Sequence, residues 1–207
     1  MRTLMMILAV AIGLTGCASS KLAADQRAAV KRVSVADPVM PEKPTVFGNG
    51  SGVGFLLGGP IGVALANAGN DLPTLYTQTL SKYGIDVAGI AKADLEAQLR
   101  KQGFTVVPQG QPADAVLQPQ VQVYGLTGDI FSSPPLRFPQ LCLRVDMVGT
   151  SAQKQIWGQQ GCLHVMPDAI KQMNARPIEE LLQNKALLDS EVHKASRLIT
   201  DDIFSKM

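Results

Sequence analysis

Residues 141–165 read LCLRVDMVGTSAQKQIWGQQGCLHV, and this stretch decides the fold. Apolar and polar side chains alternate on both sides of the polar residues 150–154, with the period of a half-buried β-strand. The stretch therefore predicts an antiparallel hairpin with a turn at 150–154 and with Met147 opposite Trp157. The second strand is expected to continue to Val165.

The same register places Cys142 directly across from Cys162, on the polar face of the hairpin. Directly opposed residues of an antiparallel pair lie about 4.5–5.5 Å apart, within reach of a disulfide. We expect a structural disulfide that closes a loop of about twenty residues and contributes on the order of 3 kcal/mol. Two independent thiols are the alternative. Cys162 and His164 also share a face, but two ligands without a second pair do not predict a metal site.

Further strands and helices are expected before and after the hairpin. Residues 115–124 alternate apolar side chains with glutamines and predict a strand, in which Pro119 indicates an edge position or a bulge. Shorter strands are expected at 30–36 and 104–108. Apolar spacing and capping residues predict helices at 72–83 after Asp71, at 87–102 after Asp86, and at 178–206 with a restart capped by Asn184.

Elements in this order predict an α+β fold. We expect a mixed or antiparallel sheet of about four to five strands with two or three helices packed on one face. A single domain is expected to span residues 30–207, because about 190 residues are enough for one sizeable core.

Residues 46–69 carry no charge, and small residues recur in them every four positions. This spacing is typical of a glycine zipper that inserts in a membrane or self-associates. Pro60 and the helix cost of clustered glycines, about 1 kcal/mol each relative to alanine, favour a loop instead. The recurring residues are Gly50, Gly54, Gly58, Gly62 and Ala66.

The proline-rich stretch between Gly125 and Gln140 predicts a long loop that exposes apolar side chains. These side chains are candidates for contact with a protein partner, or else they cap the open end of the core. They are Ile130, Phe131, Leu136 and Phe138.

The first sixteen residues have the features of an export signal. Arg2 supplies a positive start, and the apolar run from Leu4 to Leu14 is too short for a permanent membrane helix. The sequence Leu-Thr-Gly-Cys that ends at Cys17 resembles the bacterial lipobox. An ordinary secretory signal with a chance cysteine is the alternative.

The lipobox resemblance implies a signal peptide at 1–16, cleavage before Cys17 and acyl chains on the thiol and amine of Cys17. Several acyl chains together hold a protein stably on a membrane. The residue directly after Cys17 is alanine rather than aspartate, which favours the periplasmic face of the outer membrane of a bacterial envelope. The polar, alanine-rich residues that follow predict a tether at 17–29.

Charge and motifs exclude several classes of function. The chain carries 19 Lys and Arg against 17 Asp and Glu, and no basic cluster indicates a nucleic-acid partner. The sequence has no nucleophile elbow, zinc-protease motif or phosphate loop. His193 lies alone on the last predicted helix. We therefore expect a protein that is not an enzyme and uses neither cofactor nor metal.

Three local features support a family resemblance. They are residues 113–117 (ADAVL) opening a strand, residues 155–158 (QIWG) on the returning strand of the hairpin, and the closing amphipathic helix. The chain resembles small α+β periplasmic lipoproteins, which include ABC-transport auxiliary lipoproteins and proteins similar to the TolB amino-terminal domain.

This resemblance implies a sheet-and-helix sandwich and a non-enzymatic binding, assembly or transport-auxiliary role with a protein partner in the envelope. The alternative is a structural lipoprotein whose segment 46–69 self-associates or contacts lipid.

Overall fold

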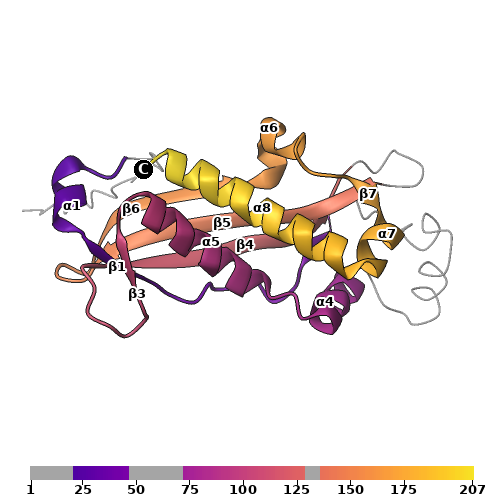
Figure 1. The fold of residues 1–207 in the computed structure, drawn as a ribbon, viewed down its shortest axis with the longest axis horizontal. Helices are drawn as coiled ribbons and strands as arrows, with labels where there is room; N and C mark the ends of the chain where they lie inside the picture. The colour runs from indigo at the N-terminus through magenta and orange to yellow at the C-terminus, as the bar shows by residue number, and fades with distance from the viewer. Residues whose placement is uncertain (1–20, 47–71, 129–135) are drawn as a thin grey trace, which may run out of the picture.

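The computed structural model describes residues 21–46, 72–128 and 136–207, and these form an α+β fold around one mixed sheet (Figure 1). The predicted fold class is confirmed. The strands are β1 (Arg32–Val35), β2 (Thr45–Val46), β3 (Thr105–Val107), β4 (Ala115–Thr127), β5 (Leu136–Gly149), β6 (Lys154–Cys162) and β7 (Arg176–Pro177). The helices in these ranges are α1 (Ala24–Ala29), α4 (Leu72–Tyr83), α5 (Val87–Lys101), α6 (Pro167–Ile170), α7 (Ile178–Gln183), α8 (Lys185–Ser205) and the 3-10 helix η1 (Leu163–Val165).

The sheet has seven strands, more than the four to five that the sequence predicts. Five of them form its main path. Its main path runs β3-β1-β4-β5-β6, with β1 parallel to both neighbours and β4, β5 and β6 antiparallel. The strand β2 pairs with β4 beyond β1, and β7 pairs with β5 beyond β6. These two additions are two residues long each, so they are too short to produce an apolar pattern in the sequence.

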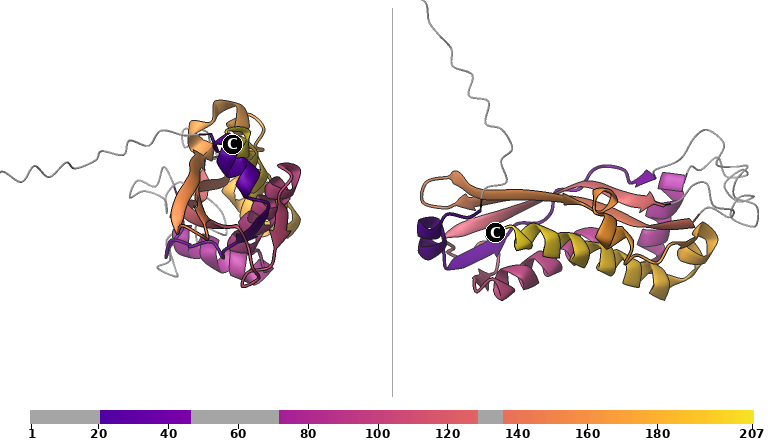
Figure 2. Two further views of the ribbon diagram at one scale, coloured as in Figure 1. Left: turned by 90° about the vertical axis from the view of Figure 1, so that its left-hand side faces the viewer. Right: turned by 90° about the horizontal axis from the view of Figure 1, so that it is seen from above.

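The two long helices α5 and α8 lie on the same side of the sheet (Figure 2). Their buried side chains form one stripe on each helix. α8 packs on β5 and β6, and α5 packs beside it on β1 and β3. Trp157 of β6 packs against Phe204 of α8, with ring centroids 5.5 Å apart. One layer of helices therefore covers one face of the sheet, as expected.

Pro119 lies in the central strand β4, so the predicted edge position is wrong. Its carbonyl accepts a hydrogen bond from Val39, and Val121 donates to the carbonyl of Val39, which places this edge of β4 toward the β1–β2 side. The segment that pairs with this edge of β4 is interrupted there, because β1 ends at Val35 and pairing resumes only at Val39. A proline is tolerated because the N–H that it lacks would face this interruption. The register shift in β4 comes two residues later, between Val121 and Val123.

The hairpin of β5 and β6 has the predicted register. Met147 lies opposite Trp157, and the register shifts by one residue only near the turn. The second strand ends at Cys162 rather than continuing to Val165, because residues 163–165 form η1. The side chain of Val165 is 65% exposed, so this part of the prediction is wrong.

The helices agree closely with their predicted bounds. Asn184 separates α7 from α8, and its Oδ1 accepts the backbone N–H of Leu187 at 3.1 Å, which confirms the predicted cap. Asp86 precedes α5 without a side-chain capping hydrogen bond. Asp71, the other predicted cap, lies outside the described residues.

The described part of the predicted tether is folded. Residues 24–29 form α1, Leu22 is buried in the core, and the Arg27 guanidinium lies 3.8 Å from the centre of the Phe104 ring. Arg27 also donates to the carbonyl of Gln102. The tether prediction therefore does not describe residues 22–29. The predicted signal peptide lies outside the described residues.

Candidate functional site

The disulfide predicted from the hairpin register is present. Cys142 on β5 pairs with Cys162 on β6, and the two Cα atoms are 4.1 Å apart. Such a short separation marks the narrow type of antiparallel pair, in which the two residues exchange no backbone hydrogen bonds. Cys142 is only 1% exposed, so the polar face of the hairpin is covered at this point.

Two polar side chains adjoin the sulfur of Cys142. Nδ1 of His164 lies 3.6 Å from Cys142 Sγ, and Nε2 of Gln140 lies 4.0 Å from it. Gln140 Nε2 also lies 3.0 Å from His164 Nδ1. Together with Cys162, these three residues form a cluster at the end of the hairpin, in which Cys142 is buried, Cys162 is half-buried and His164 is exposed.

The sheet face opposite α5 and α8 is polar over β4, β5 and β6. Arg144 and Asp146 form an ion pair on it at 2.9 Å, and Gln155 Nε2 donates to Asp146 Oδ1 at 2.9 Å. Three glutamines of β4 are exposed at alternate positions, so their side chains share this face. They are Gln118, Gln120 and Gln122.

The helix-covered side contains a small cavity at the junction of α4, α5, α8 and the sheet. Its volume of about 10 Å³ corresponds to about one water molecule. The residues that line it include Tyr76, Tyr124, Gln140 and Ser196. Ser196 Oγ is buried without a hydrogen-bond partner among the described residues. The cavity is thus suited to a buried water rather than to a substrate.

Among the described residues, two ionisable groups have a clearly shifted pKa. Burial, followed by the neighbouring Tyr124, raises the pKa of Tyr76. The backbone N–H groups of Arg32 and Lys31 lower the pKa of Asp114, because each donates a hydrogen bond of 2.8 Å to its carboxylate. Both shifts have structural causes, which are burial for Tyr76 and backbone hydrogen bonds for Asp114.

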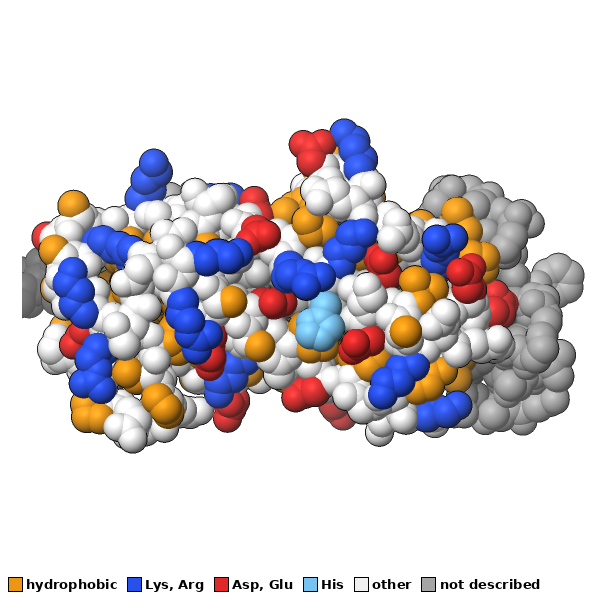
Figure 3. Space-filling view, in the orientation of Figure 1, with side chains coloured by type: hydrophobic (Ala, Val, Ile, Leu, Met, Phe, Trp, Pro, Cys, Tyr) orange, Lys and Arg blue, Asp and Glu red, His pale blue; other side chains and the backbone are white. Residues whose placement is uncertain are grey.

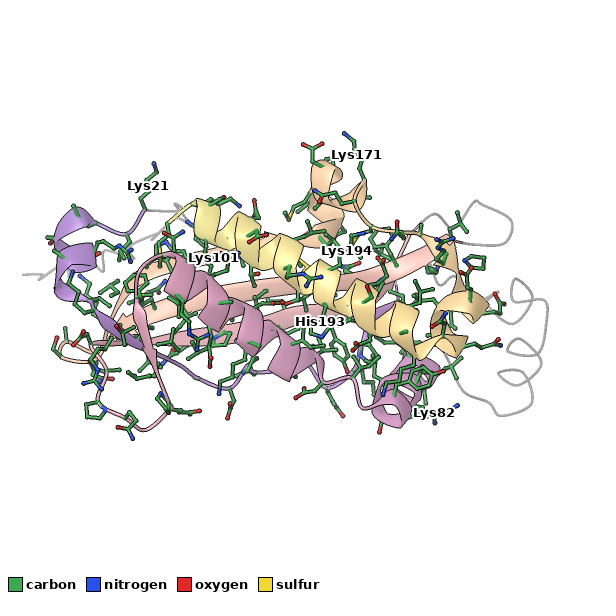
Figure 4. The ribbon with its side chains drawn as sticks, viewed as in Figure 1. Lys21, Lys82, Lys101, Lys171, His193 and Lys194 are labelled. Atoms are coloured by element: carbon green, nitrogen blue, oxygen red, sulfur yellow. A yellow bond between two sulfur atoms is a disulfide. The ribbon has the colours of Figure 1, made fainter. Side chains whose placement is uncertain are left out.

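The surface formed by α5 and α8 carries both acidic and basic side chains (Figure 3). His193 projects from α8 on this surface (Figure 4), where its Nε2 lies 4.0 Å from Asp189 Oδ1, one turn away. Glu191 of the same helix is buried, and its carboxylate accepts the side-chain amide of Asn174 at 2.9 Å. The charges of α8 thus take part in local pairs.

The residues of the predicted partner loop are placed only in part. Ile130 and Phe131 lie outside the described residues, as does Cys17. Leu136 and Phe138 belong to β5 rather than to a loop, because β5 begins at Leu136 and pairs there with β7 and β4. Phe138 is 6% exposed, so its side chain is not available for partner contact.

Gln140 is the member of the disulfide cluster that the sequence did not indicate. It falls at the end of the stretch predicted as a loop, and His164 lies 24 residues away. Its position two residues before Cys142 places both side chains on one face once that stretch is recognised as a strand.

None of the helices in the described ranges has both the length and the apolar composition that crossing a membrane requires.

Neither a family model nor a curated protein matches this sequence. Solved structures resemble it at low identity. A PelC dodecamer from Paraburkholderia phytofirmans is 12% identical with a TM-score of 0.45, over 91% of this chain and 92% of that one. A Xanthomonas campestris protein of family DUF330 is 12% identical with a TM-score of 0.43, over 83% and 80%. A lipoprotein from Neisseria meningitidis is 18% identical with a TM-score of 0.26, over 64% and 81%. The similar structures therefore include bacterial lipoproteins.

Proposed function

We propose that this chain is a bacterial envelope lipoprotein, anchored through Cys17 and facing the periplasm from the outer membrane. Its α+β domain acts as a non-catalytic binding, assembly or transport-auxiliary module. The lipobox-like sequence that ends at Cys17 supports the anchor. Replacement of Cys17 by serine should release the protein from the membrane fraction and remove the lipid mass from its amino terminus. Continued palmitate labelling of that variant would contradict the anchor.

Among the described residues no strand pairs with the outer edge of β6, and this edge is the observation that carries the binding role. This strand is nine residues long, contains no proline, and has Lys154 as its one charged residue. Charges, prolines and short length are the usual devices that prevent an edge strand from pairing with another chain. An edge with so few of them is suited to accept an extended strand of a partner protein.

The disulfide geometry identifies which backbone groups of β6 face outward. Because Cys142 and Cys162 form a pair without mutual hydrogen bonds, the N–H and C=O of Cys162 point away from β5. Alternate residues share this direction, so the groups of Gly158 and Gln160 also face outward. Among the described residues, β6 pairs with no strand other than β5, so no strand uses the outward groups of Gly158 and Gln160.

A proline substitution tests this docking mode, because it removes one outward N–H without disturbing the ladder to β5. We place a photo-crosslinking residue at Lys154 and combine it with Gln160→Pro or with Gln160→Ala. A discrete partner adduct should form in intact envelopes, persist with alanine and disappear with proline. The same crosslinker at the exposed Arg197 on α8 is the positional control. Equal adducts from the proline and alanine variants would contradict docking at this edge.

A structural role of segment 46–69 is the second candidate. The strand β2 before it contacts α4 after it, so both described flanks lie at the same end of the sheet. Deletion of 46–69 should abolish oligomers or additional membrane contact if this role is correct. The Lys154 adduct should persist in the deletion variant if the domain acts as a docking module.

A further inference from the structure

Three side chains that commonly bind metals meet at the end of the hairpin. Cys142, Cys162 and His164 each offer one ligand atom, and these atoms lie within 4.8 Å of one another. β6 stops at Cys162, and η1 then turns His164 back toward the sulfur of Cys142. The fold therefore adds a third ligand to the two that the sequence pattern alone brings together.

The spacing of the cluster fits a tetrahedral zinc ion. Zinc–sulfur bonds of about 2.3 Å and zinc–nitrogen bonds of about 2.1 Å separate sulfur and nitrogen by about 3.6 Å in a tetrahedral site. Cys142 Sγ and His164 Nδ1 are 3.6 Å apart. The sulfur–nitrogen distance that a tetrahedral zinc site requires is thus already present in the oxidised protein.

Gln140 indicates where the lone pairs of these two ligands converge. Its Nε2 lies 3.0 Å from His164 Nδ1 and 4.0 Å from Cys142 Sγ. An amide nitrogen can only donate, so in this assignment His164 Nδ1 is the acceptor and carries the lone pair. A cation would take the position toward which the Gln140 N–H group is directed.

We propose that Cys142, Cys162 and His164 form a binding site for one thiophilic divalent cation, with Zn²⁺ as the best fit, in the reduced protein. Two thiolates and one imidazole are ligands that zinc prefers, and a water molecule would complete its tetrahedron. The disulfide and the metal exclude each other, because each needs both sulfurs.

The reduction that opens the site needs a dithiol as electron donor. One thiolate of the dithiol attacks Cys162 Sγ, forms a mixed disulfide and releases Cys142 as a thiolate. The second thiol of the same dithiol then loses its proton and attacks the dithiol sulfur that is bonded to Cys162. This step closes the dithiol's own disulfide and releases Cys162 as a thiolate. The dithiol is oxidised to a disulfide, its two protons are available to the cysteines, and metal binding then displaces these protons.

The test uses the full chain with Cys17→Ser, so that Cys142 and Cys162 are its only cysteines. The protein is reduced with a phosphine, freed of reductant without oxygen, and titrated with Co²⁺ and then Zn²⁺. We expect one Co²⁺ per chain with sulfur-to-cobalt charge-transfer absorption, displacement of cobalt by Zn²⁺, and no such absorption in the oxidised protein. Zn²⁺ should also raise the Tm of the reduced protein alone.

The two histidines of the chain provide a matched control. His164→Ala should weaken Zn²⁺ binding by at least on the order of 100-fold, since losing a ligand exceeds the about 10–100-fold effect of losing an outer partner. His193→Ala on α8 should leave binding unchanged. Absence of the charge-transfer band, or equal effects of the two alanine variants, would overturn the proposal. Loss of the buried Trp157 emission on reduction would also overturn it, because the ligands would no longer be held together.

Discussion

Gly161 of β6 and Ile199 of α8 are in such close contact that a Cβ atom at Gly161 would lie 3.3 Å from Ile199 Cγ2. The same Cβ would lie 3.3 Å from Ile203 Cγ1, one turn further along the helix. The absence of a side chain at Gly161 therefore sets how closely α8 approaches the sheet.

We expect Gly161→Val to lower the free energy of unfolding by about 1–3 kcal/mol, because extra methyl groups overpack a filled core. Urea denaturation followed by Trp157 fluorescence measures this loss. Gly149→Ala is the control within the same hairpin, because its Cβ would meet Ile156 at an ordinary 3.6 Å. Equal stabilities of the two variants would show that α8 can move away from the sheet at little cost.

The disulfide should stabilise the domain, because it closes a loop with a sequence separation of 20 residues. Chain entropy predicts that reduction in metal-free buffer lowers the free energy of unfolding by about 3 kcal/mol. Denaturation with and without reductant measures the difference. The double variant Cys142→Ser, Cys162→Ser should have the stability of the reduced protein whether or not reductant is present. A response of the double variant to reductant would assign the effect to something other than this bond.

The hairpin could be predicted from the sequence, whereas the ends of the sheet could not. Alternation from Leu141 to Met147 defines which side chains face the core, and a slip of one residue would reverse them all. The pairs of β2 and β7 are set by contacts with distant residues, such as Thr45 with Gly125. No pattern of two residues can indicate such pairs.

The candidate site was predictable to the same extent. The opposed positions of Cys142 and Cys162 follow from the register of the hairpin. The approach of His164 depends on the end of β6 at Cys162 and on the turn of η1, and sequence periodicity indicated a continuing strand instead. The outward groups of β6 needed the observed pairing type, since the alternation of side chains does not show which backbone groups are bonded.

Gly125 should be essential for the pairing of β2 with β4. Its φ of +148° is rare for residues with side chains, and a Cβ would lie 1.9 Å from the carbonyl oxygen of Thr45. We expect Gly125→Ala to cost at least about 1–3 kcal/mol of unfolding free energy. Gly110→Ala is the matched control, because Gly110 also has a positive φ, +87°, but has nothing within 4 Å of its Cβ position.

The difference between these two variants isolates the contact with Thr45 from backbone strain. Thermal denaturation of both variants measures it. A Tm of Gly125→Ala equal to that of Gly110→Ala would mean that β2 contributes nothing to the stability of the sheet.

Asp114 joins three segments at the other end of the sheet. Its carboxylate accepts the backbone N–H groups of Lys31 and Arg32, and its backbone carbonyl accepts the N–H of Thr150 in the hairpin turn. The two hydrogen bonds to the carboxylate lower its pKa below 3.8 in the folded protein. At neutral pH, Asp114→Asn should lower the free energy of unfolding by about 0.5–1 kcal/mol, at the low end for hydrogen bonds because the site is exposed.

The pH dependence of this loss identifies the carboxylate as its cause. A lowered folded-state pKa stabilises the protein above the unfolded-state value of 3.8, and this contribution disappears as the pH falls through the folded-state pKa. The stability difference between wild type and Asp114→Asn should therefore be constant near neutral pH and vanish in acid. Asp168→Asn on α6 removes the same charge from an exposed carboxylate and should change stability less. A difference for Asp114→Asn that persists in acid would assign its role to packing at the end of the sheet rather than to charge.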